Sequence, residues 1–233
     1  MSETMNRFER DEALKAILKE DKFFMRKNNR VFVIGTLEEN IELNHIAGIV
    51  VREAIYETTI AAKRLSGTID KIQLYIAEKK IPEELKVNAK GQRVKVYGEF
   101  RSYNVIGTDG KNHLKLRLLV NRIETISDLT DEKDANIIYL RGAICILPFF
   151  KQTPLGRNIT ELHLAVSRNE NRKTDYIPCI AWNHNAWLTG EKNVGEMLTL
   201  YGRIQSRTYS KLDEEKGCIY RTINEVSINE IQI

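Results

Sequence analysis

The stretch GQRVKVYGEFRS at residues 91–102 returns as GEMLTLYGRIQS at residues 195–206. In both copies, apolar and polar residues alternate around an interior glycine, Gly98 or Gly202, as in a strand with one buried face. Glycine inside a strand marks a bend or a close approach of another backbone, and small barrels need such bends to close. The repeated stretch therefore predicts two copies of one small β-barrel.

Two further pairs of segments extend this repeat. NRVFVIGTL (29–37) aligns with NIIYLRGAI (136–144) at an offset of 107, and ETTIAAKR (57–64) aligns with ELHLAVSR (161–168) at an offset of 104. The first pair of stretches also has an offset of 104. Three matches in the same order indicate a tandem duplication.

Each repeat has the length of a small domain, about 100 residues. We expect a first domain at residues 29–127 and a second at residues 136–233. The polar segment SDLTDEKDAN (127–136) is the predicted boundary between them.

The second repeat has the pattern of three strands, a short helix and two more strands. The strands are expected at residues 137–147, 161–166, 175–182, 197–206 and 219–231, and the helix within 183–193. A shift in the apolar alternation between Ile223 and Val226 predicts a bulge. In the first repeat the helical segment is expected at 77–89 and the last two strands at 94–103 and 114–126. This order is that of the OB fold, so we predict an all-β protein with two tandem five-stranded OB barrels.

Residues 1–28 differ from the rest and form a predicted N-terminal extension. Within 8–25, Leu14, Ile17, Leu18 and Phe24 recur at helical spacing and form one narrow apolar stripe. We expect a short helix that packs on the barrel or on a partner chain.

The cysteine and histidine content argues against a metal or disulfide framework. Cys145, Cys179 and Cys218 are odd in number and far apart, so we expect free buried thiols. The 4 histidines have no metal-ligand spacing, and the GxxxxGK[ST] phosphate loop is missing. We therefore expect no cofactor, no metal and no enzymatic activity.

The overall charge and the hydropathy pattern limit the cellular context. The formal net charge of +4 permits a polyanionic partner without requiring one. The sequence has no apolar run of the roughly 20 residues that a bilayer requires. The charged N-terminus is unlike a secretory signal, so we expect a cytoplasmic protein.

The second repeat resembles the bacterial single-stranded DNA-binding protein family. The matching segments are NIIYLRGAI, ELHLAVSR, TDYIPCIAW, VGEMLTLYGRIQSRTY and YRTINEVSINEI. The first repeat is similar more weakly, through NRVFVIGTL and GQRVKVYGEFRS. The resemblance implies sequence-tolerant binding of single-stranded DNA in DNA replication, repair or recombination. Family members present four barrels, which implies a homodimer here, whereas their acidic recruiting tail has no counterpart after NEIQI.

The resemblance also implies stacking residues. Tyr176, Trp182 and Tyr209 fall at aromatic positions of the family, and the loop that carries a fourth aromatic there offers Arg168, Arg172 and Lys173 instead. Physical reasoning supports the first two, because residues six apart share one face of a strand and every base has a π-face on which an aromatic ring can stack.

Basic residues on the following strands are candidate phosphate contacts. They are Arg203, Arg207, Lys211 and Arg221. A weaker face on the first repeat has Arg101, Tyr103, Lys115 and Arg117, although a merely solvated charged face fits this set equally well. For Trp187, in the short helical segment, core packing is favoured over stacking.

Three alternatives stay open at this point. Trp182 has a competing interpretation as a cap on the core. The protein has a competing interpretation as an OB-fold adaptor of a primosome or helicase-loading complex, with weak DNA binding and docking through its N-terminal helix. RNA is also an open ligand, since stacking and phosphate contacts do not depend on the sugar.

Overall fold

A computed structural model describes residues 7–20, 27–48, 52–107, 110–127, 132–168, 173–213 and 217–232. The helical elements are α1 (Arg7–Glu20), η1 (Glu78–Lys80), α2 (Glu83–Val87) and α3 (His184–Gly190). The strands of the first half are β1 (Asn29–Leu37), β2 (Glu42–Ala47), β3 (Glu53–Lys63), β4 (Ile69–Ala77), β5 (Arg93–Ile106) and β6 (Asn112–Thr125). Those of the second half are β7 (Ala135–Gln152), β8 (Asn158–Ser167), β9 (Thr174–Trp182), β10 (Met197–Asp213) and β11 (Gly217–Gln232). Among the residues that the structure describes, no helix is long and apolar enough to cross a membrane.

The strands of the second half pair in a cycle. β7 pairs with β8 and β8 with β9, and β9 then runs parallel to β11 at Cys179↔Val226. β11 pairs with β10, and β10 returns to β7 at Leu198↔Gly142. The core side chains of Ile177, Cys179 and Ala181 point inward from β9. This order and direction of strands are those of the predicted OB fold.

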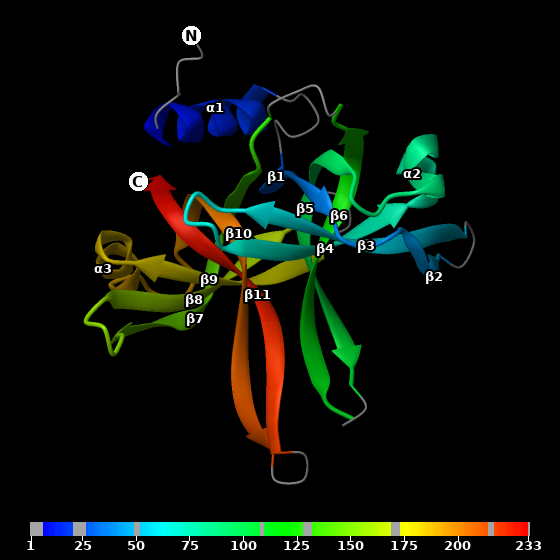
Figure 1. Cartoon of the computed structure of the whole chain (residues 1–233). Coiled ribbons are helices and arrows are strands. Elements are labelled where there is room, and N and C mark those ends of the chain that lie inside the picture. Colours follow the sequence, from blue (N-terminus) through cyan, green and yellow to red (C-terminus); the bar gives the residue numbers. More distant parts are fainter. Residues whose placement is uncertain are drawn as a thin grey trace.

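The first half repeats the cycle through β1, β3, β4, β6 and β5. Its parallel pairing joins β4 to β6 at Leu74↔Leu118, as β9 is joined to β11 in the second half. The sequence pattern did not predict β2, which lies outside the cycle and pairs with β3. The two tandem OB folds predicted from the repeat are therefore present (Figure 1).

The two halves meet through antiparallel pairing of β1 with β7, which continues one sheet across both cycles. Val31 pairs with Ile138, and these two residues are separated by the repeat offset of 107. Asn29↔Leu140 and Val33↔Asn136 are related by the same offset. The joint therefore has an approximate two-fold axis at Val31 and Ile138. Residues 128–131 are not described, so the exact domain boundary stays a prediction.

The interior glycines allow close backbone approaches, as expected. A Cβ atom on Gly98 would lie 2.4 Å from the carbonyl oxygen of Leu119, and one on Gly202 would lie 2.4 Å from that of Ser227. Each glycine adjoins a register shift, where Asn121 and Asn229 are the extra residues.

The bulge predicted between Ile223 and Val226 is wrong. The pairing of β10 with β11 is continuous there, from Gly202↔Ile228 to Asp213↔Gly217. The irregularity lies at Asn229 instead, because Gly202 lets the facing backbone come close at that point.

Helix α1 packs on the chain itself, over the joint between the halves. Leu18 is fully buried in a cluster with Phe32, Ile137 and Tyr201, and Leu14 packs against the same cluster. Arg30 donates a hydrogen bond from Nη1 to the carbonyl oxygen of Leu18 at 2.9 Å. Helix α1 is described from Arg7 to Glu20, and the rest of the predicted helical stretch, residues 21–25, lies outside the described part of the chain.

The short helix α3 does not bury its tryptophan. Ala186 and Thr189 face the core and are fully buried, whereas Trp187 is 54% exposed. Its ring centroid lies 4.7 Å from that of Phe150. The prediction of core packing for Trp187 is therefore wrong, because residues three apart occupy the buried side of this two-turn helix.

Candidate nucleic-acid interface

The outer face of β9 carries the two aromatic residues predicted to stack. Tyr176 is 50% exposed and Trp182 is half-buried, whereas Ile177 and Ala181 between them are fully buried. The predicted alternation of β9 holds at these four residues, whereas Ile180, which was expected on the outer face, is buried. Six residues of strand separate the two rings by about 20 Å, so they lie at opposite ends of this face.

A third aromatic residue shares this face and was not predicted. Phe149 on β7 is in register with Glu161 on β8, which is in register with Ile180 on β9. Directly paired residues place their side chains on the same face of a sheet. Phe149 is 59% exposed, and the ammonium of Lys151 lies 5.3 Å from its ring centroid.

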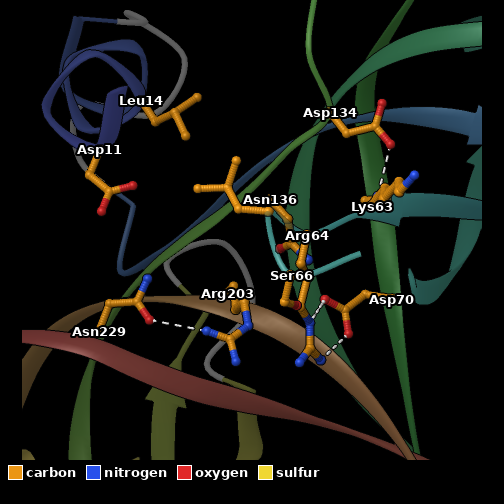
Figure 2. A pocket seen from close by; sticks show the side chains of 12 residues that line it. Asp11, Leu14, Lys63, Arg64, Ser66, Asp70, Asp134, Asn136, Arg203 and Asn229 are labelled. Carbon is orange, nitrogen blue, oxygen red and sulfur yellow. Dashed lines mark hydrogen bonds and ion pairs between the residues drawn. The ribbon is translucent and has the colours of Figure 1, made fainter. Parts of the chain in front are cut away.

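Trp182 borders a hollow of about 560 Å³ between the two halves. Arg203, a predicted phosphate contact, lines it together with Arg157 and with Arg64 of the first half. Figure 2 shows the adjoining pocket, in which Arg203 points to Asn229 and Arg64 to Asp70. The sequence analysis missed Arg64 and Arg157, because their part in the hollow depends on how the halves meet.

A second groove, of about 600 Å³, runs beside the two long hairpins β5–β6 and β10–β11. These hairpins extend in the same direction from the sheet (Figure 1). Lys115 and Arg117 of β6, Arg207 of β10 and Pro178 of β9 all line the groove. Basic residues that the sequence analysis assigned to two separate faces therefore line one groove. We call it the hairpin groove.

Burial lowers the pKa of His163, which also lines the hairpin groove. Its ring is therefore neutral at pH 7. The charged residues that line the groove are the cations Lys115, Arg117 and Arg207 and the carboxylates Glu161 and Glu225.

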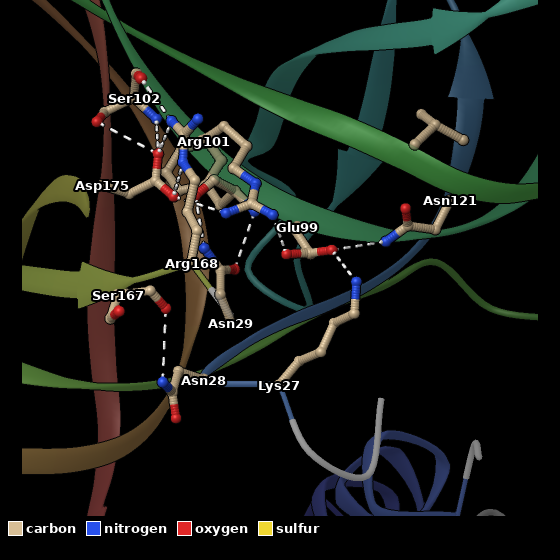
Figure 3. Close-up of polar contacts among 12 residues, drawn as sticks. Lys27, Asn28, Asn29, Glu99, Arg101, Ser102, Asn121, Ser167, Arg168 and Asp175 are labelled. Atoms are coloured by element: carbon tan, nitrogen blue, oxygen red, sulfur yellow. Dashed lines mark hydrogen bonds and ion pairs between the residues drawn. The ribbon is translucent and has the colours of Figure 1, made fainter. Parts of the chain in front are cut away.

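Arg101 and Arg168 take part in a buried network around Asp175 (Figure 3). Arg168 Nε and Arg101 Nη1 each donate to Asp175 Oδ2 at 2.9 Å, and the Ser102 N–H donates to Oδ1 at 2.8 Å. Arg101 also pairs with Glu99 and is 5% exposed. The prediction that Arg101 belongs to a binding face of the first repeat is wrong in this structure, because its guanidinium is buried between two carboxylates.

Burial alone would raise the pKa of Asp175. Hydrogen bonds from Arg168, from the Ser102 N–H and from Arg101 outweigh it and hold that pKa below its usual value. Asp175 is therefore ionised at neutral pH.

The same arrangement occurs a second time at the related position. Arg64 Nε donates to Asp70 Oδ2 at 2.7 Å, and the Ser206 N–H donates to Asp70 Oδ1 at 3.1 Å. In each case the aspartate belongs to one half and the serine to the other. We call these contacts the Asp175 lock (Arg168, Asp175, Ser102) and the Asp70 lock (Arg64, Asp70, Ser206).

The first half carries a cluster of rings on its outer face. The ring centroid of Tyr75 lies 5.6 Å from that of Tyr103 and 5.9 Å from that of His45. The guanidinium carbon of Arg117 lies 5.6 Å from the Tyr75 centroid. Tyr75 and His45 were not predicted, although the alternation of IDKIQLYIA places Tyr75 on the polar face of its strand.

Several predicted site residues have no described side chain. Tyr209, Lys211 and Arg221 lie in the β10–β11 hairpin, of which only the backbone is described there. Arg172 falls outside the described residues, and Lys173 is exposed just before β9. Their roles stay predictions.

The cysteines are free where the structure describes them. Cys179 is buried and Cys145 is half-buried, and burial raises the pKa of both thiols. The side chain of Cys218 is not described. Among the described residues, no group of three or more His, Cys, Asp or Glu side chains is placed to hold a metal ion.

The OB fold binds oligonucleotides or oligosaccharides in other proteins, and both OB folds of this chain carry aromatic and basic side chains on their outer faces. Residues 135–233 match the model of the Single-strand binding protein family. The predicted resemblance is therefore confirmed for the second half of the chain. A search of the curated proteins finds no match.

Solved structures extend this likeness in fold to both halves. The wild-type single-stranded DNA binding protein from Thermus aquaticus has a TM-score of 0.68 at 20% identity, covering 89% of this chain and 93% of that chain. A deletion mutant of the same protein has a TM-score of 0.65 at 21% identity, covering 89% and 94%. The fold of this chain is thus similar to that of a single-stranded DNA binding protein along most of its length.

Proposed function

We propose that this protein binds single-stranded DNA with little sequence preference and covers it, protecting it from nucleases and from pairing with itself. The observation that carries the proposal is the outward pair Tyr176 and Trp182, on the half that matches the family. A stacked base contributes roughly 1–3 kcal/mol irrespective of its identity. Arg203 lines the hollow that Trp182 borders, and Arg207 lines the hairpin groove, so both are suited to hold phosphates.

The proposed cellular role is in DNA replication, repair and recombination, where single strands are exposed. The proposed assembly is a homodimer that presents four OB folds. Sedimentation equilibrium of the full chain tests the assembly, and a monomer at all concentrations would overturn it.

The first test is a titration of the intrinsic fluorescence of Trp182 and Trp187 with a 35-mer of dT and with duplex DNA, at two salt concentrations. Quenching by dT and little change with duplex is the expected result. Binding should weaken with salt at a logarithmic slope of about −0.7 per phosphate contacted. Equal or negligible binding to both ligands would refute the proposal.

Two variants locate the site. Tyr176→Ala and Trp182→Ala should each weaken binding of fluorescein-labelled dT35 by a factor of about 5 to 150. Unchanged affinity in both variants would refute the proposed stacking site without refuting DNA binding itself. The same assay with an rU 35-mer decides whether RNA is also bound.

The adaptor alternative depends on α1 as a docking element. Leu14, Ile17 and Leu18, which form the described part of its apolar stripe, pack against the chain's own sheet. The geometry therefore favours the DNA-binding function over docking through this stripe.

A further inference from the structure

The hairpin groove connects the outer faces of the two halves. One wall holds Pro178, which lies two residues from Tyr176 on the outer face of β9. Another wall holds Arg117, whose guanidinium lies over the ring of Tyr75 in the first half. A ligand in this groove therefore touches surfaces from both halves at once.

Aromatic rings lie near the hairpin groove on both halves. Tyr176 is half-exposed on the second half, and the Tyr103–Tyr75 pair lies on the first half with centroids 5.6 Å apart. Tyr103 directly follows Ser102, whose Oγ accepts a hydrogen bond from the Tyr176 N–H at 2.9 Å. The backbones that carry Tyr176 and Tyr103 are thus in contact, although 73 residues separate these two tyrosines in sequence.

The Asp175 lock fixes this contact. Asp175 is fully buried and binds both Arg168 of its own half and the Ser102 N–H of the other half. A carboxylate that accepts several hydrogen bonds in a buried site holds its partners in one geometry. The spacing between the two aromatic surfaces is therefore set by the fold rather than by the ligand.

We propose that a single DNA strand crosses from one half to the other through the hairpin groove, with bases stacked on Tyr176 and on the Tyr103–Tyr75 pair. Arg117 and Arg207, which line the groove, hold phosphates of the crossing segment. This inference rests on the proposed function and adds a specific path to it. The first half then contributes stacking residues of its own rather than serving only to join the halves.

The approximate two-fold axis creates a second crossing with different chemistry. Lys71 occupies the place of Tyr176, and its N–H donates to Ser206 Oγ at 3.1 Å. Arg207 occupies the place of Tyr103, one residue after the serine. Lys71 pairs with Glu38 in a partly exposed ion pair, which a phosphate can replace at little cost, whereas Arg207 pairs with Glu225, whose carboxylate is buried. The related positions are thus aromatic at Tyr176 and Tyr103 and cationic at Lys71 and Arg207, and Arg207 also lines the hairpin groove.

The test compares Tyr103→Leu and Tyr75→Leu with Tyr97→Leu as a matched control. Tyr97 is also half-buried, with the guanidinium carbon of Arg122 3.9 Å from its ring centroid, but it lies on the β1–β5 surface away from the groove. Affinity for fluorescein-labelled dT35 is measured by anisotropy, and thermal unfolding confirms that each variant is folded. Both path variants should bind about tenfold more weakly, whereas the control should bind like the wild type.

Ultraviolet cross-linking of dT35 to the unmodified full chain gives an independent readout that needs no variant. Peptides that contain Tyr103 or Tyr75 should carry thymine adducts alongside the peptide that contains Tyr176. If Tyr176→Ala weakens binding while the path variants do not and no first-half adduct forms, the crossing is refuted and the proposed function stands. If the wild type does not bind dT35 at all, both are refuted.

Discussion

Ser102 and Ser206 are equivalent residues that each bridge to the other half. Ser102 Oγ accepts from the Tyr176 N–H and Ser206 Oγ accepts from the Lys71 N–H. Removing either hydroxyl leaves one backbone donor without this acceptor, at a cost of about 1 kcal/mol.

Ser102→Ala and Ser206→Ala should therefore lower the free energy of unfolding by similar amounts, measured by urea denaturation. Their effects on dT35 affinity should differ, because Ser102 positions a stacking residue and Ser206 positions an exposed lysine. We expect a severalfold loss for Ser102→Ala and a smaller loss for Ser206→Ala. A larger loss for Ser206→Ala would show that the cationic crossing dominates binding.

Asp175 couples the joint between the halves to pH. Its pKa is held below the usual value in the folded protein, so its carboxylate stabilises the fold above the unfolded pKa of about 3.9. That contribution is lost as the pH falls through the folded pKa. The difference in unfolding free energy between wild type and Asp175→Asn should be largest near pH 7 and shrink below about pH 4. A difference that is constant from pH 7 to pH 3 would contradict this role.

At the scale of elements, α1 adds apolar contact to the outer face of the joint. Leu18 is fully buried against Phe32 and Tyr201, and Lys15 pairs with Glu230. Leu18→Ala should lower the free energy of unfolding by about 2–5 kcal/mol, as large-to-small changes in cores do. Glu20→Ala, at an exposed position of the same helix, should change it by less than about 0.5 kcal/mol. Equal effects in urea unfolding would mean that the helix does not pack as described.

The strands with simple alternation could be predicted from sequence, whereas the irregular ones could not. The alternation in β9 placed Tyr176 and Trp182 on the outer face, and the structure agrees. By contrast, Phe149 lies beyond Pro148, which cannot donate to a sheet ladder and suggests the end of a strand. β7 continues past it because the register shifts between Ile146 and Phe149.

The locks could not be predicted because their partners are distant in sequence. Asp175 and Ser102 are 73 residues apart, and no local pattern connects them. The repeat did contain a relevant signal, since Arg64 and Arg168 occupy equivalent positions in the two copies, as do Ser102 and Ser206. Equivalent polar residues in two copies of one fold indicate a shared structural role, which here is to join the halves.

For the whole molecule, the approximate two-fold axis implies that one half can replace the other. If the second half, residues 132–233, is made alone, β7 loses the pairing of residues 135–140 with β1. Exposed strand edges recruit other strands. Because Ile138 pairs with its own equivalent, Val31, a second copy of β7 can pair with the first around Ile138. Ser206 of each copy would then take the place of Ser102 beside the partner's Asp175.

We therefore expect the isolated second half to form a dimer, weaker than the native joint. It lacks the charge of Arg101 at Asp175, because the equivalent residue of Arg101 is Gln205. Sedimentation equilibrium should show twice the mass of one copy at high concentration and dissociation on dilution. Ser206→Ala should shift this equilibrium toward the monomer, because it removes a hydroxyl acceptor at the new joint, whereas Tyr176→Ala should not. A soluble monomer at every concentration would contradict the expected pairing of two second halves. A dimer whose dissociation is unchanged by Ser206→Ala would contradict the expected contact of Ser206 at the new joint.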